Sequence, residues 1–478
     1  MRGILCVIGG FLYHLALGYF YTAGNMNPYV AQILKIESSK TSWFSSTILA
    51  LQAVFMPLGA YVATRISYRW ILLAGLIFSS GGVLLTRITV YHGLGLYILT
   101  YCIIFGIGMG LPYSVIFSIA SSWFPQKRST VVGIISSGFG LGALVFIPIQ
   151  TSIINPNNLP SVGGKFPPEV EKKVPDAFLI LGGIMLGLEV IATILLQRRP
   201  EENSSLLSTT PNDEPPSSPI GSDIMTDVKP DAPKGPKSFT VGEALKCVDF
   251  YLLWIIVFLD IISVVLLTST YKLYGLESKF DDKFLSAIAT TSAAFNCIGR
   301  VFWGFIVDHF SFKCPMMCFL LLWAAVFITF PYVTVGAAGK PLYAIWVFLL
   351  FFDLSAHFVV VPGACTRVFG HVHMATIYGL VYFATCPSAL ITAAIVSQFK
   401  LSGQWIAVYT ACGCSCLLAF VCALFVRDKD AHCVGFTNNI CAALCNPLRK
   451  DHLKEEMENS EHGFDSEEVL SVALQKAA

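Results

Sequence analysis

The chain has 478 residues and a formal net charge of +1, and only 13% of its residues are charged while 55% are apolar. Soluble domains carry charge on about a quarter of their residues. The composition therefore excludes an ordinary soluble domain and is typical of a chain whose solvent is lipid. The small net charge gives no basis for nucleic-acid binding.

Motifs for covalent chemistry are absent from the sequence. Neither a phosphate-binding loop nor a nucleophile triad is readable, so we expect no enzyme, no ATP-driven pump and no cofactor. The densest cysteine group, Cys412, Cys414 and Cys416, spreads its side chains around a helix instead of directing them at one ion. We therefore predict no metal site.

Long apolar runs recur along the chain, and a spanning helix needs about 20 mostly apolar residues. Six runs fall in the first half, near residues 4–24, 41–63, 70–88, 95–121, 130–150 and 176–197. Six more follow near residues 249–271, 284–307, 314–334, 343–366, 374–397 and 404–426. The sequence predicts an all-α membrane protein with twelve transmembrane helices in two pseudo-symmetric six-helix bundles.

A polar segment separates the two groups of spans. It is rich in Pro, Ser, Asp and Glu and cannot bury enough apolar area to order itself, so we interpret residues 200–240 as a disordered cytosolic linker. The linker divides an N-terminal bundle, 1–199, from a C-terminal bundle, 241–428. Residues 429–478 are interpreted as a cytosolic tail.

Lysine and arginine residues mark one side of the membrane. An even number of spans puts both ends of the chain on the same side, and short cytosolic loops carry an excess of positive charge. We therefore expect both termini, the linker and the tail in the cytosol. The cations behind this prediction are Arg65, Arg69, Lys127, Arg128, Arg198, Arg199, Lys313, Arg367, Arg427 and Lys429.

A loop motif recurs after the second and the eighth spans. The copies begin at Ala60 and Gly304, and each has a small residue, a polar residue four positions on, a basic or imidazole residue, a serine and a final cation. The second copy includes Asp308 and Lys313, whereas the first has Thr64 in place of the acid. This repeat indicates two similar halves.

The repeated loop resembles the signature loop of the major facilitator superfamily, in which a small residue, an acid and basic residues link helices across the bundle. The resemblance implies a role in conformational change for Gly304, Asp308 and Lys313. In the first copy it implies the same role for Arg65 and Arg69.

Two further stretches are similar to the monocarboxylate porter and oxalate/formate antiporter branch of that family. They are Trp123-Phe-Pro-Gln-Lys-Arg128 followed by Gly133, Gly138, Gly140 and Gly142, and Asn296-Cys-Ile-Gly299-Arg300 with Gly304. The resemblance implies transport of a small organic anion by alternating access. The antiporters carry a second cation in span eleven, and residues 374–398 have no lysine or arginine. One cation suits one carboxylate, so we favour a monocarboxylate.

Small residues in the fifth span allow helices to approach closely. Gly138 and Gly142 are four residues apart and share one helical face, a spacing that permits backbone contact in lipid. Two interpretations stay open, a moving contact where the halves rock and static packing.

Ionisable residues at membrane depth are costly, so each is a candidate for function. Glu189 lies toward the cytosolic side of the sixth span, and we favour a structural role for it. The candidates are His14, Glu189, Asp260, Arg300, Asp353 and His357.

Arg300 is the strongest candidate for contact with the substrate, because a guanidinium stays charged and matches a carboxylate bidentately. In the family that the chain resembles, an arginine at this place is implicated in binding the substrate carboxylate or in the coupled charge step. The alternatives are a permanent buried pair with Asp260 or Asp353, or a pair that breaks when substrate arrives. Further substrate-binding candidates are His14, Tyr21, Tyr113 and Tyr382.

Asp260, Asp353 and His357 are candidates for proton coupling or charge pairing. Asp353 and His357 are four residues apart and therefore share a helical face. Monocarboxylate porters have an acid one turn before the span-eight arginine, and Asn296 occupies that position here. Proton coupling would therefore rest on the other two acids.

These observations favour a secondary active transporter of a small organic anion, working by proton symport or anion exchange. Two alternatives remain: an amino-acid facilitator, in which Asp260 or Asp353 meets the ammonium group, and a non-transporting membrane receptor or scaffold. The expected partners are the anion, protons and the lipid bilayer, with a monomer favoured. We expect the plasma membrane or, from the dileucine-like pattern Glu202 to Leu207 in the linker, an endosomal or vacuolar membrane.

Overall fold

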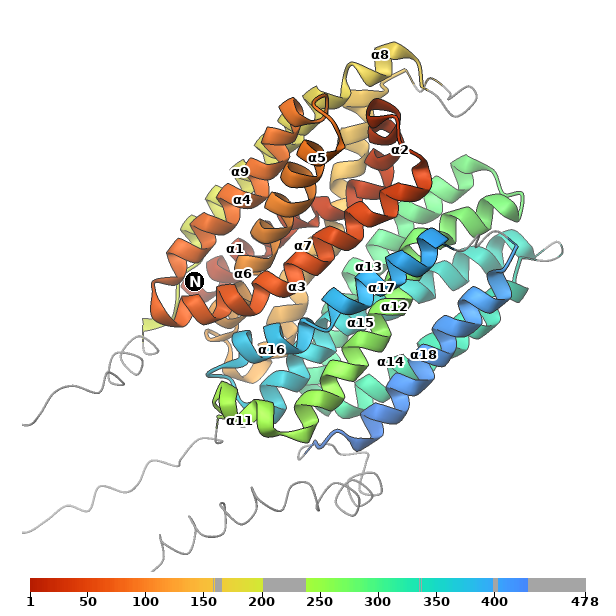
Figure 1. Ribbon diagram of the computed structural model, residues 1–478. Helices are drawn as coiled ribbons and strands as arrows, with labels where there is room; N and C mark the ends of the chain where they lie inside the picture. The colour runs from red at the N-terminus through yellow and green to blue at the C-terminus, as the bar shows by residue number, and fades with distance from the viewer. Residues whose placement is uncertain are drawn as a thin grey trace, which may run out of the picture.

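The computed structural model describes residues 1–428 apart from 158, 160–165, 201–237, 335, 337 and 399–402. Every regular element within these residues is a helix (Figure 1). Eleven stretches of the described residues are long and apolar enough to cross a membrane. They are Arg2–Leu34, Ser42–Arg65, Tyr68–Thr89, Leu94–Ser121, Pro125–Ile154, Pro168–Leu195, Val248–Glu277, Lys313–Tyr332, Gly339–Phe369, Met374–Gln398 and Trp405–Phe425.

The remaining long helix, α13, spans Asp282–Phe310 and is not among the eleven apolar stretches. It carries Asn296, Arg300 and Asp308 along its length. The helix packs between α7 (Arg128–Ile154) and α15 (Gly339–Phe369), which shield these polar side chains from lipid. With α13, the described part of the chain contains the twelve long spans that the sequence predicts.

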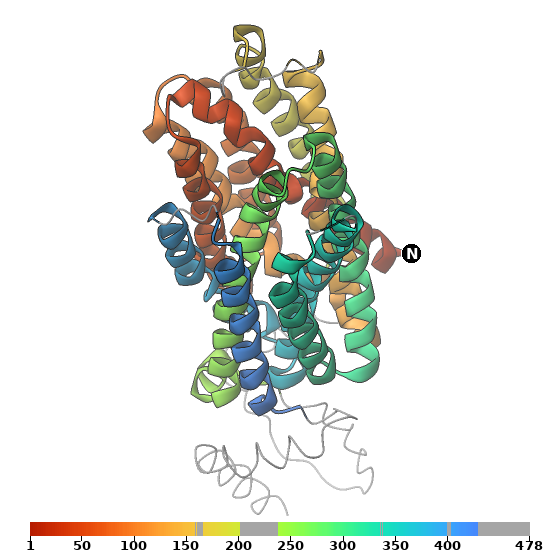
Figure 2. The same cartoon turned by 90° about the vertical axis from the view of Figure 1, so that its right-hand side faces the viewer.

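The first six spans pack together as one bundle (Figures 1 and 2). Its first span is built from α1 (Arg2–Leu17), η1 (Gly18–Thr22) and α2 (Ala23–Leu34), and its fourth from α5 (Leu94–Tyr97), η3 (Ile98–Ile104) and α6 (Phe105–Ser121). The other long helices are α3 (Ser42–Arg65), α4 (Tyr68–Thr89), α7 and α9 (Val174–Leu195), and the short elements are η2 (Ser38–Thr41), η4 (Pro125–Lys127) and α8 (Pro168–Glu171).

The second bundle lies beside the first and begins with a short helix, α11 (Val241–Lys246). Its long helices are α12 (Val248–Glu277), α13, α14 (Lys313–Thr329, extended by η5, Phe330–Tyr332), α15, α16 (Met374–Tyr382), α17 (Thr385–Gln398) and α18 (Trp405–Phe425). The last turns of α9 and α18 and the start of α11 lie at the same end of the molecule (Figure 1). The predicted linker and tail fall almost wholly outside the described residues, and the domain limits stay a prediction.

The first span is longer than the sequence predicts, because polar residues after position 24 find partners. The Asn25 side chain donates to the side-chain oxygens of Gln150 at 3.0 Å and Thr151 at 3.3 Å. The Gln32 side chain accepts from the backbone N–H of Phe166 at 2.7 Å and donates to its carbonyl at 3.0 Å. These bonds allow α2 to continue the span beyond η1, as far as Leu34.

Glycines bring the backbones of α7 into contact with two different neighbours. A Cβ atom at Gly138 or Gly142 would collide with the backbone of α1 or with Gly18, inside the N-terminal bundle. A Cβ atom at Gly133 or Gly140 would instead meet α13 of the other bundle. The pair Gly138 and Gly142 therefore serves packing within one half. The contact between the halves is made instead by Gly133 and Gly140, which are seven residues apart on another face of α7.

Replacing Gly138 with alanine should destabilise the N-terminal bundle by about 1–3 kcal/mol, because the new methyl group has no space beside Phe11. The matched control is Gly183→Ala on α9, where a Cβ atom would meet nothing within 4 Å. Thermal unfolding of the two detergent-purified variants checks this. Equal midpoints for Gly138→Ala and the unchanged protein would contradict the packing.

Candidate functional site

Arg300 lies at the contact between the two bundles and is completely buried. Its Nε donates to Oδ1 of Asn296 at 2.8 Å, one turn earlier on α13. Its Nη1 donates to the backbone carbonyl of Ser136 on α7 at 3.0 Å. Its Nη2 donates to the hydroxyl of Tyr21 at 3.4 Å. The guanidinium of the C-terminal half is thus held largely by groups of the N-terminal half.

Two aromatic rings cover the guanidinium. The Cζ atom of Arg300 lies 4.5 Å from the ring centre of Phe358 on α15 and 5.6 Å from that of Phe139 on α7. Both distances allow a cation–π attraction. Gly140 makes this arrangement possible, since a Cβ atom there would lie 2.9 Å from Oδ1 of Asn296 and 3.2 Å from Nε of Arg300.

The charge of Arg300 is not neutralised by any carboxylate among the described residues. No acid of these residues lies within ion-pair distance of it, and its three hydrogen-bond acceptors are neutral. A guanidinium has five N–H groups. Three donate to the acceptors named above, and the neutral hydroxyl of Tyr113 is a further partner of the guanidinium. The site can therefore receive an anion with two oxygens.

The other predicted substrate-binding residues adjoin the guanidinium. The ring of His14 lies 4.8 Å from that of Tyr113, and Tyr113 stacks at 6.4 Å on Tyr382. Tyr113 and Tyr382 both lie within electrostatic range of Arg300. Together with Tyr21, these residues form one connected cluster that we call the arginine cluster.

His14 has one ring nitrogen engaged and one without a partner. Its Nδ1 lies 3.1 Å from the backbone carbonyl of Gly10 and therefore donates to it. In the neutral ring this leaves Nε2 as an acceptor, and Nε2 is buried with no hydrogen-bond partner among the described residues. The ring stacks on Phe117 at 4.8 Å, which fixes its orientation.

Exposure within the arginine cluster is uneven. His14, Tyr113, Tyr382 and Arg300 are at most 1% exposed, whereas Tyr21 keeps an intermediate exposure. Its hydrogen bond to Arg300, at 3.4 Å, is also the longest of the three and therefore the weakest. Tyr21 is thus the neighbour that an incoming group would displace most readily.

Sequence reasoning missed the residues that surround Arg300 from other helices. Ser136 and Phe139 carry no charge and sit in an apolar span, and Phe358 is one of many phenylalanines. The available signal was local: Phe139 stands among the closely spaced glycines Gly138, Gly140 and Gly142, and small residues at such spacing mark a close helix contact in lipid.

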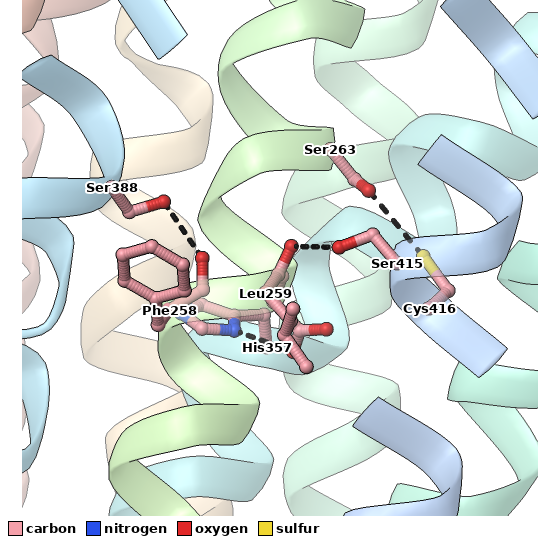
Figure 3. A network of polar contacts seen from close by, with 8 residues as sticks. Phe258, Leu259, Ser263, His357, Ser388, Ser415 and Cys416 are labelled. Atoms are coloured by element: carbon pink, nitrogen blue, oxygen red, sulfur yellow. Dashed lines mark hydrogen bonds and ion pairs between the residues drawn. The ribbon is translucent and has the colours of Figure 1, made fainter. Parts of the chain in front are cut away.

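A second polar cluster lies inside the C-terminal bundle, and Figure 3 labels one of its members, His357. Nδ1 of His357 lies 3.0 Å from Oδ2 of Asp260, linking α15 to α12, and both side chains are buried. Asp353 is completely buried one turn before His357. Oδ1 of Asp260 and both carboxylate oxygens of Asp353 have no hydrogen-bond partner among the described residues. We call these three residues the C-terminal acid cluster.

The alternative of a pair between Arg300 and an acid is not formed in this structure. Asp260 pairs with His357, and Asp353 has no ion-pair partner in the described residues. The two acids lie within electrostatic range of Cys416 on α18, whereas Arg300 extends to the α7 side. Arg300 is thus paired with neither acid in this conformation.

The second loop motif joins the two halves at one end of the molecule. Asp308, near the end of α13, accepts from the backbone N–H groups of Ser129 at 2.9 Å and Thr130 at 2.7 Å. These are the first N–H groups of α7, which have no intrahelical acceptor. Gly304 lies against the same turn, where a Cβ atom would be 2.6 Å from the carbonyl of Ser129. An acid of one half thus caps a helix of the other half.

The remaining motif residues contact groups of their own half. The backbone N–H of Lys313, at the start of α14, donates to Asp428 at 3.2 Å within the C-terminal half. Arg65 donates to the hydroxyl of Tyr61 on its own helix at 3.3 Å. Thr64 donates to the carbonyl of Tyr61 at 2.7 Å, and Arg69 is exposed on the first turn of α4.

Glu189 on α9 is buried inside the N-terminal bundle, apart from both clusters. It accepts hydrogen bonds from the hydroxyls of Ser79 at 2.7 Å and Ser80 at 2.5 Å on α4. Both of its oxygens therefore have donors, in agreement with a structural role.

The fold and the two buried clusters define a class, the multi-pass helical membrane transporters built from two bundles. The family model described as Major Facilitator Superfamily matches residues 7–386. The chain belongs to the Major Facilitator Superfamily.

Two solved transporters share the fold over most of their length. FucP in its outward conformation superposes with a TM-score of 0.60 at 13% identity, over 87% of this chain and 98% of that one. The proton:xylose symporter XylE superposes with a TM-score of 0.63 at 14% identity, over 90% of this chain and 96% of that one.

Three characterised relatives are similar in sequence. Apicoplast pyruvate carrier 1 of Toxoplasma gondii is 26% identical over 461 residues, covering 81% of this chain and 82% of the relative. The oxalate:formate antiporter of Oxalobacter formigenes is 23% identical over 324 residues, covering 68% of each. Monocarboxylate transporter 12 of Mus musculus is 21% identical over 421 residues, covering 82% of this chain and 78% of the relative. These relatives agree with the branch that the sequence motifs resemble.

Replacing Asp308 with alanine should expose the first turn of α7, because its N–H groups lose their acceptor in the other half. The loss of such a cap costs about 0.5–2 kcal/mol. Faster amide hydrogen exchange at Ser129 and Thr130 is the expected result. Thr64→Ala is the matched control, since Thr64 bonds only within its own helix, and unchanged exchange in Asp308→Ala would contradict the cap.

Proposed function

We propose that this chain is a secondary active transporter of a small monocarboxylate and not an enzyme. The observation that carries the proposal is the buried charge of Arg300, which has no carboxylate partner among the described residues. Charge at membrane depth is costly to keep, and an anionic substrate supplies the missing partner. The names of the relatives, a pyruvate carrier, an oxalate:formate antiporter and a monocarboxylate transporter, support the same substrate class.

The arginine cluster suits the carboxylate of a small substrate. The two oxygens of a carboxylate can bind N–H groups of Nη1 and Nη2, in the bidentate geometry that guanidinium favours, when neutral tyrosine hydroxyls are displaced. Tyr21, which makes the weakest bond, gives way to the incoming group. Nε2 of His14 is available to accept a hydrogen bond from the remainder of the substrate.

The number of cations favours one carboxylate over two. Arg300 is the single Arg or Lys of α13 between Phe284 and Phe310, and α16 and α17 contain neither residue type. A dicarboxylate would bring its second charge among the rings of Tyr113, Tyr382 and Phe139. We therefore propose lactate-like or pyruvate-like anions over oxalate.

The two other functions are less well supported by the geometry. An amino acid bound at Arg300 would need an acid for its ammonium group, and Asp260 is committed to His357 inside the C-terminal bundle. A receptor or scaffold has no use for an uncompensated buried charge. Both alternatives lack a contact that favours them.

Substrate binding and the movement of the halves are linked through the same hydrogen bonds. Arg300 holds Ser136 and Tyr21 of the N-terminal half, so these bonds must break when the halves separate. A bound carboxylate replaces them and lowers the cost of separation. We propose that alternating access proceeds in this way, with the cap at Asp308 closing one end.

The membrane topology completes the proposal. We propose bundles at 1–199 and 241–428, a linker at 200–240 and a tail at 429–478, with both termini in the cytosol. The exposed Arg65 and Arg69 fall on the side of the membrane assigned to the cytosol. The protein would act as a monomer in the plasma membrane or in an endosomal or vacuolar membrane.

Replacing Arg300 with lysine should lower monocarboxylate transport about 10- to 100-fold, because an ammonium cannot offer the planar fork and charged hydrogen bonds contribute about 1.5–3 kcal/mol. The measurement is exchange of labelled lactate, pyruvate, formate, oxalate or alanine in proteoliposomes loaded with the unlabelled compound. Arg87→Lys, at an arginine that is 46% exposed and pairs with Asp176, is the control. Full activity of Arg300→Lys would refute the carboxylate site, and exchange of alanine alone would favour the amino-acid alternative.

A protease site inserted between residues 201 and 237 should be cut only from the cytosolic side. The reason is the charge of the short loops, which places this segment with Arg65 and Arg69. Cleavage of sealed vesicles of known orientation checks the topology. Cleavage from the opposite face would invert it.

A further inference from the structure

We propose that the C-terminal acid cluster, Asp260, His357 and Asp353, is a proton-binding site separate from the substrate site, and that it drives accumulation of the substrate bound at Arg300. This inference rests on the proposed carboxylate transport. It assigns the proton to the interior of one bundle, where α12 and α15 face each other, and not to the contact between the halves.

The first argument is the unsatisfied chemistry of the cluster. An ionised carboxylate is an acceptor only, and three buried carboxylate oxygens of Asp260 and Asp353 have no donor among the described residues. Buried polar atoms in native structures nearly always have a partner. A proton bound by either acid turns one of its oxygens into a donor and removes the cost of burying that carboxylate's charge.

The second argument is the setting of the cluster, which holds its geometry fixed. Ser388 of α17 donates to the carbonyl of Phe258 at 2.7 Å, and Ser415 of α18 donates to that of Leu259 at 2.8 Å. These bonds fix α12 to α17 on one side and to α18 on the other, immediately before Asp260 (Figure 3). A rigid site keeps the distance between Asp260 and His357 constant, so that a proton can pass between them.

The groups that face the cluster come from several helices. Asp260 belongs to α12, Asp353 and His357 belong to α15, and Cys416 of α18 lies within electrostatic range of both acids. α17 contributes the neutral hydroxyl of Ser388. The cluster therefore contains two acids and one base, and a single added proton changes its net charge from −2 to −1 when both carboxylates are ionised and the imidazole is uncharged.

The contact between α13 and α15 joins this cluster to the substrate site. His357 is followed directly by Phe358, the ring that lies 4.5 Å from Cζ of Arg300. Gly299, next to Arg300, packs against Phe352 and Ser355 on α15. These two residues directly precede and follow the pair Asp353-Leu354. A movement of Arg300 toward a substrate is thereby transmitted to the helix that carries two of the three cluster residues.

The sign of the coupling follows from charge. An anion bound at Arg300 adds one negative charge to the interior of the protein, and added negative charge favours the binding of a proton there. Anion binding therefore raises the proton affinity of the cluster, and by reciprocity protonation raises the affinity for the anion. Coupling of this sign produces symport. Asn296, which occupies the place next to the guanidinium, is neutral and only orients it.

The choice of a proton over a sodium ion follows from the donor set. His357 turns a ring nitrogen toward Asp260 at 3.0 Å, and an imidazole paired with a carboxylate exchanges protons. Hard cations prefer a cage of oxygen ligands. The transport experiment nevertheless includes a sodium gradient as an alternative driving force for accumulation.

The experiment uses proteoliposomes of the full-length chain and labelled pyruvate, in two modes. With coupling of one proton per anion, a gradient of one pH unit should support accumulation of up to about tenfold in the unchanged protein. Asp353→Asn should abolish this accumulation and retain pyruvate exchange, which needs no net proton movement. Asp260→Asn is a second variant with the same expectation.

Glu189→Gln is the matched control, because Glu189 is an equally buried acid whose oxygens both have serine donors. It should keep gradient-driven accumulation. If Glu189→Gln loses accumulation as Asp353→Asn does, then loss of any buried acid stops accumulation, and the assignment of the proton site to the C-terminal acid cluster is overturned. Accumulation that persists in both cluster variants would overturn it as well.

Measurements on the unchanged protein separate this inference from the proposed function. Pyruvate added to the detergent-purified protein in a weakly buffered dye solution should cause proton uptake. Exchange without proton uptake, or accumulation driven by sodium and not by pH, overturns the proton site and leaves the carboxylate function standing. Absence of exchange with every carboxylate overturns both.

Discussion

The structure depends on one constraint, the burial of the Arg300 guanidinium at membrane depth without a counter-charge among the described residues. A charge at the centre of a spanning helix costs about 2.5–3.5 kcal/mol on insertion scales. The protein offsets that cost with neutral acceptors and two aromatic rings, contributed mainly by the opposite half. Gly133 and Gly140 allow α13 to pack closely on α7. This close packing keeps the guanidinium away from lipid.

The two halves contribute different groups to the contact between them, and this difference determines how the contact is held closed. The C-terminal half supplies the cation, the acid cluster and the Asp308 cap, whereas the N-terminal half supplies carbonyls, rings and helix N–H groups that receive them. Because Thr64 bonds only to its own helix, the cap exists on one side of the interface. The α7–α13 contact is therefore held at two levels, at Asp308 and at Arg300, and opening requires both to change.

Most of the architecture was predictable, since apolar runs of spanning length and a repeated loop are strong signals in sequence. The cluster of His14, Tyr21, Tyr113 and Tyr382 around Arg300 was predicted as a set of residue types at membrane depth, and the structure does bring them together. Their partners were not predictable: Ser136 contributes only a backbone carbonyl, and Phe139 and Phe358 are neutral. The absence of an Arg300–acid pair could not be predicted from the sequence either. Helical spacing shows which residues share a face of one helix, but it does not show toward which neighbouring helix that face is turned.

The central claim is that the uncompensated Arg300 binds the carboxylate of the substrate. A structure determined at saturating pyruvate tests it most directly. The account predicts the carboxylate within hydrogen-bonding distance of Nη1 and Nη2 of Arg300, between Phe139 and Phe358, with the bond to Tyr21 broken. Pyruvate bound elsewhere, with the bonds from Arg300 to Tyr21 and Ser136 unchanged, would contradict it.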